Sequence, residues 1–252
     1  MNKRHLKKTY LYLLPSSLGT TLFYTAPFFV MLIFALGGKN DIIELGKNHA
    51  FSVGAQNTIV FLACGIGSAL LLGMCVSLVL QPQSFSIKLM MLIPLMIPSA
   101  AVAVIWRALI PQESLVVLIL LLVWKVTGIN AVLFSAAHSR IPIEIVESGR
   151  LDGAGRIRLF FRIKWPFLAS SVFFASLIDL FFAWRTFREV YLLTGDYPHD
   201  SIYLIQHYLM HMFRRLQYGR LATASLVVIV LVVAVTGVAL LLTNIWGKDI
   251  DQ

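Results

Sequence analysis

The chain has 252 residues, of which 58% are hydrophobic and only 13% are charged. A soluble domain of this length cannot bury so much apolar surface, so this composition and a mean hydropathy of +0.81 exclude the soluble classes and indicate a polytopic membrane protein. The net charge of +9 is explained by Lys and Arg at the cytoplasmic ends of spans, and we expect no nucleic-acid partner.

Six segments are apolar over the roughly 20 residues that a membrane helix requires. They lie at about residues 9–36, 51–80, 89–109, 114–137, 167–182 and 221–246. The first run is too long for a signal peptide and no small-x-small cleavage site follows it, so we predict a retained anchor. The sequence therefore predicts an all-α membrane protein with six transmembrane helices, in which residues 1–252 form a single transmembrane domain.

Several residues inside the predicted spans support more than one interpretation. Pro94 and Pro98 either kink the third span or are ordinary prolines of a membrane helix. Lys125 lies in the middle of the fourth span and must face protein or water, or extend to the interface. Asp179 lines a pore, pairs with Lys125, or lies at the membrane interface.

Small residues in the second span favour packing over chemistry. Gly65, Gly67 and Gly73 allow another helix to approach closely. Cys64 and Cys75 lie eleven residues apart on one predicted helix, too far for a disulfide, and are interpreted as packing residues.

A polar loop at residues 138–166 joins the fourth and fifth spans. Its basic residues are Arg140, Arg150, Arg156, Arg158, Arg162 and Lys164. Together with the basic N-terminal segment they place this loop and both termini in the cytoplasm. Pro142 suits the first turn of a helix, Gly149 and Gly153 suit its end or a bend, and Asp152 is expected to cap the next helix, which runs into the fifth span at Pro166.

No motif for covalent chemistry is present. The sequence lacks a Walker-type loop, a His-Glu-x-x-His and a Cys-x-x-Cys, so no nucleotide, cofactor or metal site is predicted, and there is no nucleophile–base pair for an enzyme. His207 and His211 are four residues apart but lack a third ligand, which favours an amphipathic loop helix.

The polar loop resembles the Glu-Ala-Ala motif in permease subunits of binding-protein-dependent ABC importers. It reads Glu147-Ser148-Gly149, then Asp152-Gly153-Ala154, Phe160, and Ile163-Lys164-Trp165-Pro166. Both alanines of the family pattern are replaced, while the acid, the Asp-Gly-Ala and the proline are in register. Further similar stretches lie in order at Asn57-Thr58, 93–98, 105–107, 123–128, 187–198 and 218–225, and those at 187–198 resemble the carbohydrate-uptake subgroup of the maltose and glycerol-3-phosphate type.

This resemblance implies a permease subunit in a bacterial or archaeal cell (inner) membrane. It would form a translocation path with a second, homologous permease, above ATPase subunits that bind ATP and Mg, and receive solute from an extracytoplasmic binding protein. The cytoplasmic coupling helix would lie between spans four and five. The residues implied in ATPase coupling are Glu147, Asp152, Gly153, Ala154 and Pro166. The link at 110–113 is shorter than is usual in the family.

Sugars present apolar ring faces and hydroxyl edges, which suit aromatic and hydrogen-bonding side chains. The candidates for the solute path are Asp179, Trp184, Phe187, Glu189 and Tyr191. An interfacial aromatic belt is the competing interpretation of these aromatic residues. Arg185 and Arg188 leave a phosphorylated polyol or another solute open as the cargo, and an ion-gradient-driven secondary transporter is the rival from another class.

Overall fold

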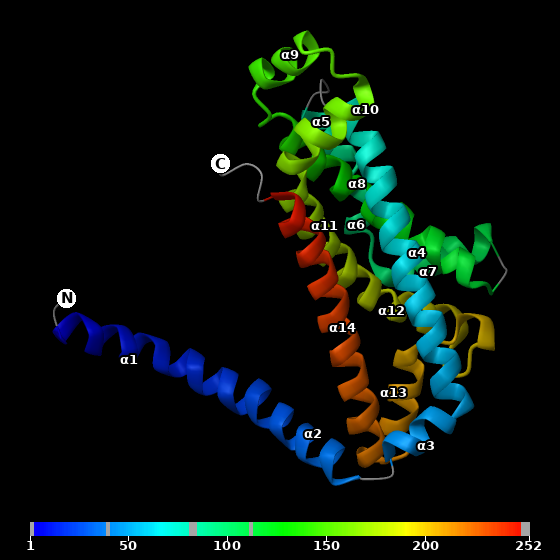
Figure 1. The fold of residues 1–252 in the computed structure, drawn as a ribbon. Helices are drawn as coiled ribbons and strands as arrows, with labels where there is room; N and C mark the ends of the chain where they lie inside the picture. The colour runs from blue at the N-terminus through cyan, green and yellow to red at the C-terminus, as the bar shows by residue number, and fades with distance from the viewer. Residues whose placement is uncertain (1–2, 39–40, 81–84, 111–112, 248–252) are drawn as a thin grey trace. The chain divides into compact units, whose positions relative to one another are not determined.

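The computed structural model describes residues 3–38, 41–80, 85–110 and 113–247, and these residues are helical throughout apart from turns and short links. In chain order the helices are α1 (Lys3–Thr20), the π-helix η1 (Thr21–Thr25), α2 (Ala26–Gly37), α3 (Asp41–Lys47), α4 (His49–Leu80), α5 (Phe85–Met90), α6 (Ile93–Met96), α7 (Ser99–Leu109), α8 (Leu115–His138), α9 (Ile143–Leu151), α10 (Arg156–Leu159), the π-helix η2 (Phe160–Lys164), α11 (Trp165–Arg185), α12 (Phe187–Thr194), the 3-10 helix η3 (Asp200–Ile202), α13 (Ile205–Arg214) and α14 (Tyr218–Gly247). Figure 1 labels these helices where there is room.

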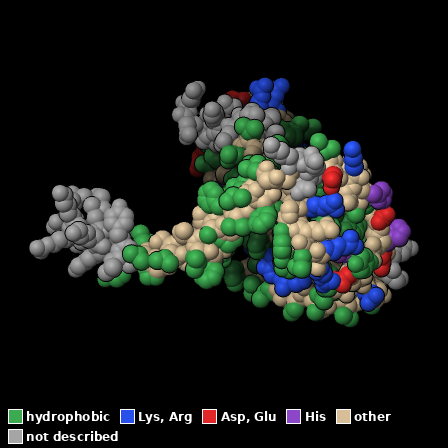
Figure 2. Space-filling model, turned by 90° about the horizontal axis from the view of Figure 1, so that it is seen from below, with side chains coloured by type: hydrophobic (Ala, Val, Ile, Leu, Met, Phe, Trp, Pro, Cys, Tyr) green, Lys and Arg blue, Asp and Glu red, His purple; other side chains and the backbone are tan. Residues whose placement is uncertain are grey.

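Five segments of the described chain are long and apolar enough to cross a membrane. They are Tyr12–Gly37, His49–Leu80, Leu115–His138, Arg156–Thr194 and Tyr218–Leu241. These segments coincide with the predicted first, second, fourth, fifth and sixth spans. Arg156–Thr194, which corresponds to the predicted fifth span at 167–182, is longer at both ends than predicted. Hydrophobic side chains also cover much of the surface seen in Figure 2, as expected where the solvent is lipid.

The predicted third span at 89–109 is not one helix. It is divided into α5, α6 and α7 by a turn at Met91–Leu92 and an extended link at Ile97–Pro98. Ile97 has a ψ of 129°, because a residue that precedes proline is driven out of the helical region, and Pro98 cannot donate a helical hydrogen bond. Of the two interpretations of these prolines, interruption of the helix is the correct one.

The described chain divides into two compact units. One contains residues up to Ser52 together with Tyr208–Leu231, and the other contains Val53–His207 and the residues from Val232 onward. In the first unit an exposed ion pair joins Arg220 Nη2 to Glu44 Oε2 at 2.7 Å. The candidate functional residues all belong to the second unit.

Glycines bring α4 close to α8 in this second unit. A Cβ on Gly65 would lie 2.8 Å from Leu122 Cδ2, and one on Gly73 would lie 2.5 Å from the Cβ of Asn130. Gly67 has no such neighbour within 4 Å. The prediction of close helix approach is therefore confirmed for Gly65 and Gly73, whereas no described residue of the chain approaches Gly67 in this way.

Candidate functional site

The loop between α8 and α11 folds into two short helices joined by a tight turn. After α9 ends, the Gly153 N–H donates to the Arg150 carbonyl and the Ala154 N–H donates to the Gly149 carbonyl, both at 3.0 Å. Gly153 has a φ of +77°, a conformation that glycine adopts without the steric penalty other residues meet. The expected order of helix, turn and helix is present, with Pro166 in the first turn of α11. Asp152, however, is the C-cap of α9, and Gly155 precedes α10, so the expected capping role of Asp152 is wrong.

α9 packs directly against the helix that leads into α11. Gly149 is buried, and a Cβ at this position would overlap Ile163 Cδ1 in η2. Leu159 of α10 is also buried, with Cδ1 3.9 Å from the same Cβ position. α10, η2 and α11 follow one another without a break, so this contact joins α9 to the continuous helical segment that contains α11.

The outer face of the loop is open to a partner. Glu147 is exposed, as are Asp152 and Gly153, while Ala154 and Pro166 are half-buried. Two large apolar side chains accompany these acids, since Leu151 is 89% exposed and Ile157 is 77% exposed.

Replacing Gly153 with valine is expected to weaken the turn. The site is sterically open, with nothing within 4 Å of an added Cβ, so the cost comes from the positive φ alone and is about 1 to 3 kcal/mol. Gly155→Val is the matched control, because Gly155 is equally open but has a φ of −64°. Thermal unfolding of the two purified variants measures the difference, and equal melting temperatures would contradict this account of the turn.

Asp179 is fully buried in α11. Its Oδ2 accepts a hydrogen bond from Asn130 Nδ2 of α8 at 2.8 Å. No hydrogen-bond partner lies near its Oδ1 among the residues that the structure describes. Lys125 pairs instead with Glu189, so the interpretation that Asp179 pairs with Lys125 is wrong.

Glu189, a candidate for solute contact, also has no exposed surface. Its Oε1 is bound by Lys125 Nζ from α8 and accepts a hydrogen bond of 2.8 Å from Ser99 Oγ at the start of α7. Three helices therefore meet at this buried carboxylate.

Replacing Asn130 with alanine is expected to destabilise the protein by about 1 to 3 kcal/mol, because the buried Asp179 loses its hydrogen-bond donor. Thermal unfolding of the detergent-solubilised protein measures this loss. Adding Asp179→Leu to Asn130→Ala is expected to recover part of the stability, since both polar groups are then removed. A double variant as unstable as the sum of the two single variants would show that the hydrogen bond carries no stability.

The aromatic candidates lie on α11 and α12. The ring centroids of Phe187 and Tyr191 are 6.1 Å apart, and the Phe187 ring meets His207 edge-on at 4.8 Å. Trp184 is half-buried, and its carbonyl accepts a hydrogen bond from Gln206 Nε2 at 2.8 Å. Within the described ranges, no group of three or more His, Cys, Asp or Glu side chains is arranged for a metal ion.

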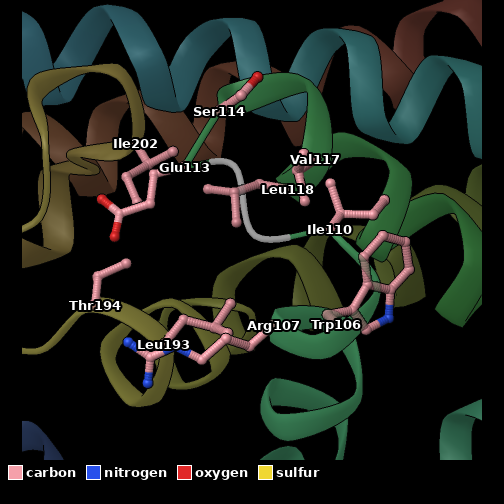
Figure 3. Close-up of a pocket in the computed structure, with 10 residues that line it drawn as sticks. All are labelled: Trp106, Arg107, Ile110, Glu113, Ser114, Val117, Leu118, Leu193, Thr194 and Ile202. Atoms are coloured by element: carbon pink, nitrogen blue, oxygen red, sulfur yellow. The ribbon is translucent and has the colours of Figure 1, made fainter.

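A small cavity lies where α7, α8, α12 and η3 approach one another. It has a volume of about 50 Å³, and its lining includes Trp106, Arg107, Glu113 and Thr194. Figure 3 shows Glu113, Thr194 and Arg107 along one side, with Trp106 across from them. Ligand pockets usually measure about 300 to 1,000 Å³, so this cavity is too small for a sugar.

Sequence reasoning missed Ser99, Asn130 and Gly128. Asn130 carried a usable signal, because an amide in an apolar run needs a polar partner. Ser99 and Gly128 gave no signal of their own. Ser99 donates a hydrogen bond to Glu189, and a Cβ on Gly128 would overlap the carbonyl oxygen of Met91; both partners are distant in sequence.

Comparison with known proteins places most of the chain in one family. The sequence profile of the binding-protein-dependent transport system inner membrane component matches residues 14–247. The sn-glycerol-3-phosphate transport system permease protein UgpA of Yersinia enterocolitica is 26% identical, over 90% of each chain. The osmoprotective compounds uptake permease protein GgtC of Synechocystis sp. is 23% identical, over 83% of this chain and 84% of its own.

Solved structures share the fold. A bacterial ABC transporter involved in the import of the acidic polysaccharide alginate contains a chain that matches with a TM-score of 0.73 at 16% identity, over 99% of this chain and 98% of its own. A bacterial alginate ABC transporter in complex with an alginate pentasaccharide-bound periplasmic protein matches with a TM-score of 0.71 at 17% identity, over 98% of this chain and 96% of its own.

Proposed function

We propose that residues 141–166 couple the solute path of this chain to the partner ATPase. The chain belongs to the family of inner membrane components of binding-protein-dependent transport systems. It is therefore a non-catalytic permease subunit of an ABC importer in the inner membrane. The observation that carries this proposal is the contact of α9 with η2 at Gly149 and Ile163. Through this contact a movement of α9 would move α11, and Glu147 lies on the exposed side of α9.

Coupling needs a partner that changes shape. The chain has no nucleotide site, and uphill transport requires an energy source, so ATP and Mg are bound by the ATPase subunits. Glu147 offers a carboxylate to a cationic groove, where a charge-assisted hydrogen bond strengthens once water is excluded. Asp152, Gly153, Ala154 and Pro166 shape the turn and the start of α11. Closure of the ATPase then favours one of two permease conformations that differ in solute affinity.

The proposed topology has six crossings, with both termini in the cytoplasm of a bacterium or archaeon and residues 1–252 forming one transmembrane domain. Five crossings are the long apolar segments, and α5, α6 and α7 together make the third. The arginines and lysines of the coupling loop support a cytoplasmic location for α9. A second, homologous permease completes the path, and an extracytoplasmic binding protein delivers the solute.

The proposed cargo is a sugar or oligosaccharide. Aromatic side chains at Trp184, Phe187 and Tyr191 support this class, because sugar rings pack on aromatic faces. The names of the relatives point to polyol phosphates, osmoprotective compounds and an acidic polysaccharide. Exposed Arg185 and Arg188 keep a phosphorylated polyol as the second candidate, since guanidinium groups bind phosphate.

The test begins with gentle extraction from the native membrane and identification of the proteins that co-purify. An ATPase and a second permease at fixed stoichiometry are expected. The complex is then placed in liposomes with its binding protein and tested for ATP-dependent uptake of radiolabelled maltose, trehalose and sn-glycerol 3-phosphate. A chain that purifies alone and transports without ATP would overturn the proposal in favour of an ion-coupled carrier.

A further inference from the structure

One buried contact joins three helices of the second unit. Glu189 of α12 accepts from Ser99 Oγ of α7 at 2.8 Å and pairs with Lys125 Nζ of α8. The Glu189 side chain has no exposed surface, and the Lys125 side chain is 6% exposed. A charge buried in this way is tolerated only when its partner is in place, so the relative positions of the three helices are tied to this contact.

The contact lies at the point where the broken third span resumes. Ser99 is the first residue of α7, directly after the extended link at Ile97–Pro98, and no side chain of the N-cap residue Pro98 caps this end. A carboxylate at a helix N-terminus is stabilised by the helix dipole. Glu189 therefore supplies from α12 the negative charge that the isolated start of α7 favours, and Lys125 balances it from α8.

The opposite face of α12 carries the aromatic pair. A helix turns about 100° per residue, so Phe187 and Tyr191 both lie on the side away from Glu189. Their ring centroids are 6.1 Å apart, and both side chains are half-buried. Whatever holds Glu189 in place consequently sets the position of these two rings.

We propose that Lys125, Glu189 and Ser99 form a positioning lock that holds α12 against α7 and α8 and thereby sets the aromatic pair Phe187 and Tyr191 for solute. The functional half of this proposal rests on the proposed transport function, whereas the structural half does not. In this assignment Glu189 acts through α12 and does not touch the solute.

The decisive variants separate charge from shape. Glu189→Gln keeps the acceptor for Ser99 but leaves Lys125 buried without a counter-charge. Lys125→Met combined with Glu189→Gln removes both charges at similar volume, and such neutral replacements are often tolerated where a single loss is not. The control is Glu44→Gln, which makes the same chemical change in an exposed ion pair with Arg220.

Spin labels report the position of α12 without any solute. They are attached to cysteines at the exposed positions Leu120 of α8 and Arg188 of α12, after Cys64 and Cys75 are replaced by serine in the full complex in lipid nanodiscs. One narrow distance population is expected in the parent and in Glu44→Gln. Glu189→Gln is expected to add a second, broader population, and the neutral double variant to return to one. An unchanged distribution in Glu189→Gln, or a double variant as broad as the single, would overturn the lock.

Uptake kinetics test the functional half with radiolabelled maltose and sn-glycerol 3-phosphate. Glu189→Gln is expected to raise KM roughly tenfold to hundredfold with little change in Vmax, because misplaced binding groups weaken binding, and the double variant is expected to recover most of this loss. If the double variant recovers the narrow distance but not KM, Glu189 contacts the solute directly and the positioning assignment is wrong. If the Glu189→Gln permease fails to assemble into the complex, the lock predicts that the double variant still assembles. A double variant that also fails to assemble would overturn the lock. Absence of ATP-dependent uptake by the parent complex would count against the proposed function and leave the distance test standing.

Discussion

Replacing Glu147 with alanine is expected to reduce the stimulation of ATP hydrolysis by the loaded binding protein strongly, while the permease still inserts and assembles. Glu147 is exposed on α9, and its side chain makes neither a hydrogen bond nor an ion pair in the described part of the loop, so its removal is not expected to impair folding. A hydrogen bond to a charged group contributes about 1.5 to 3 kcal/mol, which corresponds to a roughly tenfold to hundredfold loss of coupling.

The measurement is ATP hydrolysis by the complex in nanodiscs, with and without loaded binding protein. Glu147→Gln is expected to retain part of the stimulation, because the amide oxygen still accepts a hydrogen bond but lacks the charge. Glu44→Ala removes an exposed acid outside the loop and should have no effect. Full stimulation in Glu147→Ala would show that coupling does not pass through this carboxylate.

Replacing Gly128 with alanine is expected to cause a large loss of stability. A Cβ at this position of α8 would overlap the carbonyl oxygen of Met91, in the turn between α5 and α6. Backbone atoms cannot rotate away as a side chain can, so α8 and the broken third span must separate. The expected cost is about 3 kcal/mol, the upper end of the range for an over-packed core.

Gly67→Ala is the matched control for this substitution. Gly67 is also inside a long helix, α4, but has nothing within 4 Å of an added Cβ. Both substitutions improve helix propensity by up to about 1 kcal/mol, so their difference isolates the overlap with Met91. The melting temperature and the yield of folded protein should fall for Gly128→Ala and not for Gly67→Ala. Similar stability of the two variants would contradict the packing at Met91.

The sequence predicts the long helices well because an apolar run of sufficient length has few alternatives in lipid. α4 and α8 begin and end within two residues of the predicted spans at 51–80 and 114–137. The third span could not be predicted in the same way. Its composition satisfies a hydropathy window, but the backbone is broken by Pro94 and Pro98 and held by contacts with α8. Hydropathy measures how apolar a segment is and not whether its helical backbone hydrogen bonds are continuous.

The coupling loop was predictable because its signals are local. A proline and two glycines within about three turns set the first helix and the turn, whereas Asp152 ends the first helix instead of capping the second. The pairing of Lys125 was not predictable, because Glu189 lies 64 residues away and Asp179 was an equally plausible acid on a nearby helix. Choosing between them requires the packing of α7, α8 and α12.

The interruption of the third span also has a consequence for how the chain enters the membrane during synthesis. α5, α6 and α7 have 6, 4 and 11 residues, and none is long enough to cross a bilayer alone. The backbone groups at the two breaks would be left without partners in lipid, so this segment is stable there only when protein surrounds it. α8, which accommodates the Met91 carbonyl at Gly128, is synthesised after it. In the proposed topology, residues 85–109 are therefore expected to stay in the translocon until α8 emerges and can surround the two breaks.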